Sequence, residues 1–222
     1  MDDLLKQLAY CVERGKVDKN APYPPDMKDQ EGASEITEQL LKNGVAANDI
    51  LKNGLMIGMN AIGDKFSQGK AFIPELLISA KAMNAAMVHL KPYFESGEAK
   101  HRGTFIIGTV AGDLHDIGKN IVRMVLEGDG WKVIDLGVDV KTDKFLSALE
   151  EHPQAWVGMS ALLTTTMINM EGNVKAIKSK SPHTKVFVGG APLSKSFNDK
   201  IGADGYFPDP HSFARHLAEL VQ

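Results

Sequence analysis

Residues 104–120 read TFIIGTVAGDLHDIGKN, a short apolar run that leads through a polar loop into a segment with helical spacing. The run at 104–110 is rich in β-branched residues and predicts a buried strand. Similar runs, separated by helix-length segments, follow at 131–136, 155–159, 185–188 and, more weakly, 205–207. This alternation predicts a five-stranded parallel sheet covered by helices on both faces.

The first half of the chain has apolar residues at helical spacing instead. Between residue 34 and about residue 94 this spacing predicts three helices, separated by the turn signals Asn43-Gly44 and 67–70. A shorter apolar stripe upstream, ended by Gly15, predicts a fourth helix that closes a bundle. The Pro-rich segment 20–25 predicts an extended connection, because each proline fixes φ and lacks an amide donor.

A polar stretch at 95–103 separates the two patterns and predicts a linker. The sequence therefore predicts an α+α/β two-domain protein. Residues 1–94 would form a four-helix bundle, and residues 104–222 a Rossmann- or flavodoxin-like α/β domain with a five-stranded parallel sheet.

Composition excludes several classes of protein. The 222 residues include 25 Lys+Arg and 28 Asp+Glu, and a formal charge of −3 gives no electrostatic support for nucleic-acid binding. The single cysteine, Cys11, cannot form an internal disulfide or a CxxC pair, which favours a reducing compartment. We expect no signal peptide and no membrane span, because the first residues are acidic and no apolar run approaches about 18 residues. A cytoplasmic protein is predicted.

Chemistry-bearing residues follow three of the predicted strands, at 111–120, 160–166 and 189–192. Ligands of open parallel sheets bind outside the carboxyl ends of the strands, where these loops meet. Asp113 and His115 are two residues apart, so the carboxylate can accept the Nδ1 proton and leave Nε2 free to bind a metal. The hydroxyl of Ser160 could hold the carboxylate. The alternative role of His115 is to cap the following helix.

Other ligand classes fit these loops less well. The first loop lacks GxGxxG, no GK[ST] is present, and a receiver-domain interpretation of Asp113 leaves the glycines unexplained. A zinc hydrolase needs two further ligands, and the other histidines show no ligand spacing. A phosphate-binding α/β module stays an alternative. One histidine is sufficient where a macrocycle already fills the equatorial positions of the metal.

The pattern Asp113-x-His115-x-x-Gly118, followed by Ser160-x-Leu162 and Gly189-Gly190, resembles the cobalamin-binding signature of methionine synthase, the adenosylcobalamin mutases and the corrinoid methyl-carrier proteins. The triplet alone is a weak signal, whereas the combination is specific. The resemblance implies a cobalamin whose lower base leaves the cobalt for a slot beside the sheet. His115 would then be the cobalt ligand, Asp113 its carboxylate partner and Ser160 the hydroxyl behind it.

The resemblance also implies which residues surround the cofactor. The glycines would line the slot for the nucleotide tail, since a close approach of backbone leaves no room for Cβ. Thr164 and Thr165, with Ser160 and Leu162, would form one wall, and N-capping of the next helix is the alternative for the threonines. The implied cofactor-binding set is Gly112, Asp113, Leu114, His115, Asp116, Ile117, Gly118, Ser160, Leu162, Thr164, Thr165, Gly189, Gly190, Phe72 and Leu76.

The first half resembles the four-helix cap that shields the upper corrin face in methionine synthase and the methyl carriers. The resemblance rests on Gly54–Met59, Gly63–Phe66 and Gly69–Leu77, and it leaves roughly the first 30 residues uncovered. Phe72 and Leu76 are the expected contacts with the methyl face, and most other apolar positions are expected to be bundle core.

A chain of this length does not hold the substrate modules of a mutase or a whole methionine synthase, and it offers no DNA-binding helix pair. The resemblance therefore implies a free-standing carrier, similar to the corrinoid subunits of methanol, methylamine, glycine betaine and aryl methyl ether methyltransferase systems. The cobalt would cycle between Co(I) and methyl-Co(III), and an ATP-dependent reductive activator would rescue Co(II). A donor-specific methyltransferase and an acceptor methyltransferase, acting on tetrahydrofolate or a thiol, would be the partners, with residues 95–103 as a hinge. A cobalamin-sensing or storage module is the alternative.

Overall fold

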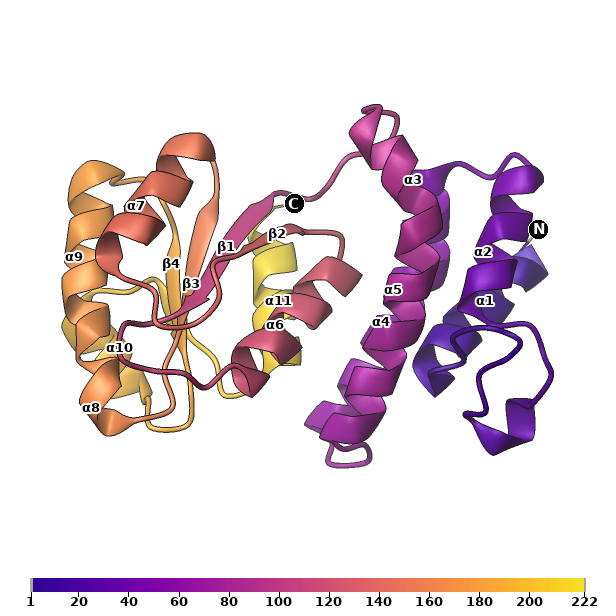
Figure 1. Ribbon diagram of the computed structural model, residues 1–222, viewed down its shortest axis with the longest axis horizontal. Coiled ribbons are helices and arrows are strands. Elements are labelled where there is room, and N and C mark those ends of the chain that lie inside the picture. The colour runs from indigo at the N-terminus through magenta and orange to yellow at the C-terminus, as the bar shows by residue number, and fades with distance from the viewer. Residues whose placement is uncertain (1, 222) are drawn as a thin grey trace. The chain divides into compact units, whose positions relative to one another are not determined.

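The computed structural model describes residues 2–221, and the chain separates into two units (Figure 1). One unit ends at His101 and also contains Gly128–Gly130. The other contains Arg102–Glu127 and continues from Trp131. Each unit has its own buried core. None of the helices in the described part of the chain is long and apolar enough to cross a membrane.

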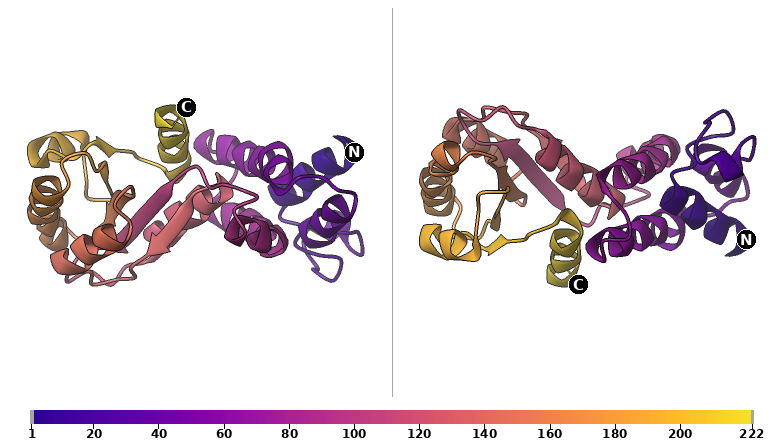
Figure 2. Two further views of the ribbon diagram at one scale, coloured as in Figure 1. Left: turned by 90° about the horizontal axis from the view of Figure 1, so that it is seen from above. Right: turned by 90° about the horizontal axis from the view of Figure 1, so that it is seen from below.

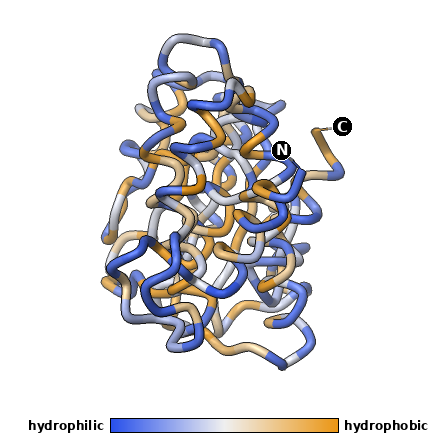
Figure 3. The backbone as a smooth tube through the Cα atoms, turned by 90° about the vertical axis from the view of Figure 1, so that its right-hand side faces the viewer, coloured by the Kyte–Doolittle hydropathy of each residue, from blue (hydrophilic) through white to orange (hydrophobic). Residues whose placement is uncertain are grey.

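The first unit is a helical bundle, as the apolar spacing predicts. Its elements are α1 (Asp2–Arg14), a 3-10 turn (Pro25–Met27), α2 (Ala33–Lys42), α3 (Ala47–Ile50), a π-helical turn (Leu51–Leu55), α4 (Met56–Ser67) and α5 (Ile73–Glu95). The segment from α3 through the π-turn to α4 is continuous, so four helical rods result. Within the bundle, α1 packs against α4 and α2 against α5. Figure 3 shows hydrophobic and hydrophilic residues interspersed along the backbone.

Local chemistry sets the ends of these helices. Gly44 and Gly69 follow α2 and α4 with φ of +76° and +70°, a left-handed backbone that suits glycine. At the start of α5 the carboxylate of Glu75 accepts the backbone N–H of Phe72 at 2.8 Å, and Pro74 lies in the first turn. The extended connection expected at 20–25 forms only in part: the Ala21 amide donates to the Asp18 carbonyl at 3.3 Å in a turn, Pro24 is extended, and the 3-10 turn begins at Pro25.

The second unit contains a five-stranded parallel sheet. Its strands are β1 (Thr104–Thr109), β2 (Lys132–Asp135), β3 (Trp156–Ser160), β4 (Val186–Gly189) and β5 (Gly205–Tyr206), in the order β2-β1-β3-β4-β5. The helices are α6 (Ile117–Gly128), α7 (Thr142–Glu151), α8 (Thr164–Met167), α9 (Asn169–Lys180), α10 (Lys195–Ile201) and α11 (Pro210–Leu220). The predicted fold class is confirmed.

Both faces of the sheet are covered (Figure 2). On one face, side chains of α7 and α9 pack with strand residues such as Ile106 and Val157 in one apolar cluster. On the other face, Phe213 of α11 lies edge-on to Phe105 and Phe187, with ring centroids 5.6 and 5.1 Å apart. Burial of both faces explains why the strands are nearly continuously apolar.

The strand order reverses at β1. The chain passes from β1 to β2 on one side and later places β3 on the other, so a topological switch point lies between β1 and β3. Thr109 pairs with Ser160 there, and the amide of Val110 donates to the carbonyl of Ser160 at 3.0 Å. The carboxyl ends of the strands therefore bring the loops at 111–116 and 161–163 together.

Candidate functional site

Asp113 is the centre of this loop cluster. Its side chain is completely buried. Oδ2 accepts hydrogen bonds from the amide of Leu162 at 2.8 Å and from the hydroxyl of Thr166 at 2.6 Å. Oδ1 accepts Nδ1 of His115 at 2.7 Å and the His115 amide at 3.1 Å. The loops after β1 and β3 are thus joined through one carboxylate.

These donors keep Asp113 ionised. Burial opposes ionisation, but the hydrogen bonds from Thr166, Leu162 and His115 outweigh it and hold the pKa of the carboxyl well below its usual range. An ionised carboxylate only accepts hydrogen bonds, so the proton between Asp113 and His115 belongs to Nδ1 of the imidazole. In the neutral form of the ring, Nε2 then carries a lone pair.

The His115 ring is accessible on its other side. Half of the side chain is exposed, and no group in residues 2–221 forms a hydrogen bond with Nε2. Its backbone carbonyl accepts the Thr109 hydroxyl at 2.9 Å, which fixes the loop behind the ring. A neutral imidazole with Nδ1 on a carboxylate and Nε2 open is the form that binds a metal. Helix α6 begins only at Ile117, two residues beyond the histidine.

The hydroxyl behind Asp113 is not that of Ser160. Ser160 ends β3, and its hydroxyl forms no hydrogen bond with Asp113; Thr166 supplies the hydroxyl instead. The reason is geometric, because the turn after β3 leads into α8 and rotates Thr166 inward. Thr166 is buried, whereas Thr164 and Thr165 are exposed. The N-cap of α8 is Leu163, so the threonines are not caps.

Several large apolar side chains around the histidine are exposed. Leu114 and Ile117 expose 73% and 68% of their surface, and Leu162 and Leu163 of the neighbouring loop are also exposed. Asp116 and Gly112 lie on the same loop and are exposed too. Apolar surface gathered beside a buried carboxylate marks a ligand site rather than a solvated loop.

The glycines near the site differ in the space around them and in their backbone angles. A Cβ on Gly118 or Gly189 would meet nothing within 4 Å, so these two leave open space at the edge of the sheet. Gly190 has φ of +136°, and a Cβ there would lie 1.8 Å from the carbonyl oxygen of Ala161. The local backbone therefore requires glycine at position 190, a reason separate from its expected role in lining the slot.

The two residues predicted for the upper corrin face belong to the helical unit and differ in exposure. Phe72, the N-cap of α5, exposes 69% of its surface. Leu76, one turn later, exposes 2% and belongs to the bundle core. In this structure Phe72 alone of the pair offers side-chain surface to a ligand.

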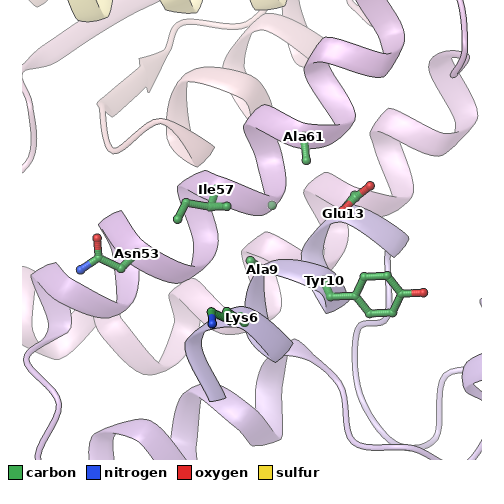
Figure 4. Close-up of a pocket in the computed structure, with 8 residues that line it drawn as sticks. Lys6, Ala9, Tyr10, Glu13, Asn53, Ile57 and Ala61 are labelled. Carbon is green, nitrogen blue, oxygen red and sulfur yellow. The ribbon is translucent and has the colours of Figure 1, made fainter. Parts of the chain in front are cut away.

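The helical unit also contains a shallow groove that the sequence did not indicate (Figure 4). It lies between α1 and the rod formed by the π-turn and α4. A Cβ on Gly58 would lie 2.4 Å from the carbonyl oxygen of Ala9, so the two helices approach closely there. The groove is lined by Lys6, Ala9, Tyr10, Glu13, Asn53, Ile57, Gly58 and Ala61.

The site at the sheet edge fits a cofactor that brings its own metal. No group of three or more His, Cys, Asp or Glu side chains within residues 2–221 could hold a metal ion alone. A single open imidazole, exposed apolar side chains and two glycines beside open space suit a corrinoid, which needs one axial nitrogen and room for its tail.

Comparison with known proteins agrees with this chemistry. Two profiles, both described as B12 binding domains, match residues 103–212 and 28–91. Trimethylamine corrinoid protein 1 of Methanosarcina acetivorans is 40% identical over 182 residues, which cover 80% of this chain and 84% of that protein. Dimethylamine corrinoid protein 1 of the same organism is 38% identical, with 81% and 86% covered.

Solved structures of similar proteins share the fold. A cobalamin-binding protein from Desulfitobacterium hafniense DCB-2 matches with a TM-score of 0.74 and 28% identity over 98% of both chains. A chain of the methanol:cobalamin methyltransferase complex MtaBC from Methanosarcina barkeri matches with a TM-score of 0.82 and 25% identity, over 100% of this chain and 80% of that one. The chain belongs to the corrinoid proteins with B12-binding domains, and its cofactor is cobalamin.

Proposed function

We propose that this corrinoid protein carries a methyl group from a donor-specific methyltransferase to an acceptor methyltransferase. The observation that carries the proposal is the Asp113–His115 pair, with its open Nε2, beside glycines that leave space. When bound, cobalamin supplies a cobalt that accepts and releases the methyl group. His115 would ligate that cobalt in place of the lower base.

In this proposal the protein's own residues set the state of the imidazole. Asp113 holds the proton on Nδ1, and Thr166 with the amide of Leu162 keeps the carboxylate fixed and charged. In the neutral imidazole this arrangement leaves Nε2 open as the nitrogen that would bind the cobalt. The exposed side chains of Leu114 and Ile117 would cover the corrin and exclude water.

The tail of the cofactor would lie along Gly118 and Gly189, where added side chains meet nothing. Ser160, Leu162, Thr164 and Thr165 remain the proposed wall of this slot. Phe72 is the proposed contact with the methyl face, and residues 95–103 the proposed hinge that exposes this face to each partner.

The names of the relatives favour a methylated amine as the methyl donor. They are described as trimethylamine and dimethylamine corrinoid proteins, and the MtaBC neighbour is a complex with a methyltransferase. Methanol, glycine betaine and aryl methyl ethers are the other donors to compare. Tetrahydrofolate or a thiol would be the acceptor, and an ATP-dependent activator would restore Co(II) that forms by oxidation.

A reconstitution assay tests the proposal. The protein is loaded with hydroxocobalamin, desalted, reduced and mixed with trimethylamine, a free thiol, a trimethylamine methyltransferase and a thiol-specific methyltransferase. We expect methylated thiol with wild type and with His183→Ala, an exposed histidine outside the site, and at least about tenfold less with His115→Ala. Tight cobalamin retention without transfer from any of the donors would instead indicate storage or sensing.

A further inference from the structure

We propose that Asp139 is a positioning residue that holds the loop of residues 111–116 and so aims the His115 ring. The inference rests on the proposed function of His115 as a cobalt ligand. Asp139 lies in the connection between β2 and α7, outside the motif that carries the resemblance.

Asp139 contacts the histidine loop at two points. Its Oδ1 accepts the amide N–H of Gly112 at 2.7 Å, and its own amide donates to the carbonyl of Asp113 at 3.0 Å. Two consecutive loop residues are thereby tied to a single residue of another strand connection. The attachment is itself anchored, because the next residue, Val140, bridges to Val110 and donates its amide to Thr109.

The backbone of Asp139 is strained. Its φ is +52°, in the left-handed region that favours glycine. The connection already uses glycine for this purpose at Gly137, where φ is +85°. Glycine at 139 would remove the strain but also the acceptor for Gly112, so the strained backbone and the carboxylate together indicate a function at this position.

The contact bears on the histidine through Asp113. The carboxylate of Asp113 is fixed by the loop after β3, whereas its backbone is fixed by Asp139. The 2.7 Å bond from Nδ1 of His115 to Oδ1 of Asp113 depends on both. A loop released at Gly112 would let the ring tilt, and ligand geometry tolerates only about 0.5 Å of displacement.

Three variants of the full-length protein separate strain, acceptor and charge. Asp139→Gly relieves the backbone and removes the acceptor, whereas Asp139→Asn keeps an amide oxygen in a residue that tolerates positive φ. Asp29→Gly is the matched control, because exposed Asp29 in the helical unit has φ of +62°. Amide hydrogen exchange of Gly112 in the cofactor-free protein reports whether its hydrogen bond to Asp139 is formed. Nitrogen superhyperfine splitting in the cob(II)alamin EPR spectrum reports whether the His115 ring ligates the cobalt.

We expect Asp139→Gly to lose Gly112 protection and to lower the ratio of histidine-ligated to unligated cobalt about tenfold, as for loss of one charged hydrogen bond. Its Tm should stay within a few degrees of wild type, and Asp139→Asn and Asp29→Gly should keep both signals. Unchanged splitting in a folded Asp139→Gly protein, or an unprotected Gly112 amide in wild type, would overturn the inference. Wild type with a protected Gly112 but no nitrogen splitting would instead refute His115 as the ligand, and the aiming role with it.

Discussion

The two units of the chain use apolar residues in opposite ways. In the helical unit, Met83 is buried in the bundle as its spacing predicts, and Leu76, expected at the methyl face, is also buried in the bundle. At the carboxyl edge of the sheet, Leu114 and Ile117 are largely exposed, while the carboxylate of Asp113 beside them is completely buried. This inversion of the usual distribution identifies the ligand site better than residue type does. In the helical unit Phe72 is similarly exposed, as are Val88 and Ile57.

Replacing His115 tests the inverted region most directly and should have the largest effect. We expect His115→Ala to retain some cobalamin, since the tail slot binds independently of the cobalt, but to lose the axial nitrogen completely. The EPR spectrum of the cob(II)alamin form should show nitrogen superhyperfine splitting for wild type and His183→Ala and none for His115→Ala. Splitting that persists in His115→Ala would exclude this residue as the ligand.

Gly189 and Gly190 are adjacent, and replacing each in turn distinguishes an effect on the tail slot from an effect on the fold. A valine at Gly189 enters open space, so Gly189→Val should leave the sheet intact and weaken cobalamin binding by about 1–3 kcal/mol through crowding of the tail. Cobinamide lacks the nucleotide, so its dissociation constant for Gly189→Val should stay within about threefold of the value for wild type.

Gly190→Val is the contrasting variant. It conflicts with φ of +136° and with the carbonyl of Ala161, so it should destabilise the α/β unit and weaken both ligands together. Isothermal titration with each ligand, alongside thermal unfolding, measures the difference. Equal losses of cobalamin and cobinamide in a stably folded Gly189→Val protein would place the slot elsewhere.

The sequence predicts local relations well and distant ones poorly. The apolar runs of the strands and the change from helical to strand patterns along the chain follow from burial and residue spacing. The Asp113–His115 hydrogen bond spans only two residues. Thr166 could not be chosen over Ser160, because the rotation of the turn after β3 decides which hydroxyl faces Asp113. Asp139 carried no signal, since its role depends on a backbone angle.

Phe72 and Leu76 differ in exposure because Phe72 is the extended N-cap before α5, whereas Leu76 lies within the helix, and two alanine variants test this difference. Leu76→Ala leaves a cavity in the bundle and should lower the free energy of unfolding by about 2–5 kcal/mol. Phe72→Ala keeps the backbone bond to Glu75 and should change it by no more than about 0.5 kcal/mol. Urea unfolding followed by far-UV circular dichroism compares them. A large loss for Phe72→Ala would contradict its assignment as a free contact residue.

The smallest expected effect concerns how each unit buries a titratable group. Asp113 is buried as an ion because several donors bond to it, whereas the Cys11 thiol has a weak contact, 3.7 Å to the carbonyl of Glu31. Burial accordingly raises the pKa of Cys11 to about 11, and the nearby charge of Lys16 lowers it by less. The folded protein therefore favours the neutral thiol.

The sign of the pH dependence follows from this pKa. The stabilising contribution of the neutral thiol is complete below the unfolded pKa of about 8.5 and is lost as pH rises toward 11. Between about pH 8.5 and 11, the free energy of unfolding should fall more steeply with pH for wild type than for Cys11→Ala. The slopes are compared instead of the absolute values, because the variant also removes core volume. At pH 8 about 0.1% of the native thiol is ionised, so iodoacetamide should label Cys11 slowly until urea unfolds the bundle. Rapid labelling of the native protein, measured by mass spectrometry, would show that the helical unit opens more readily than its buried core implies.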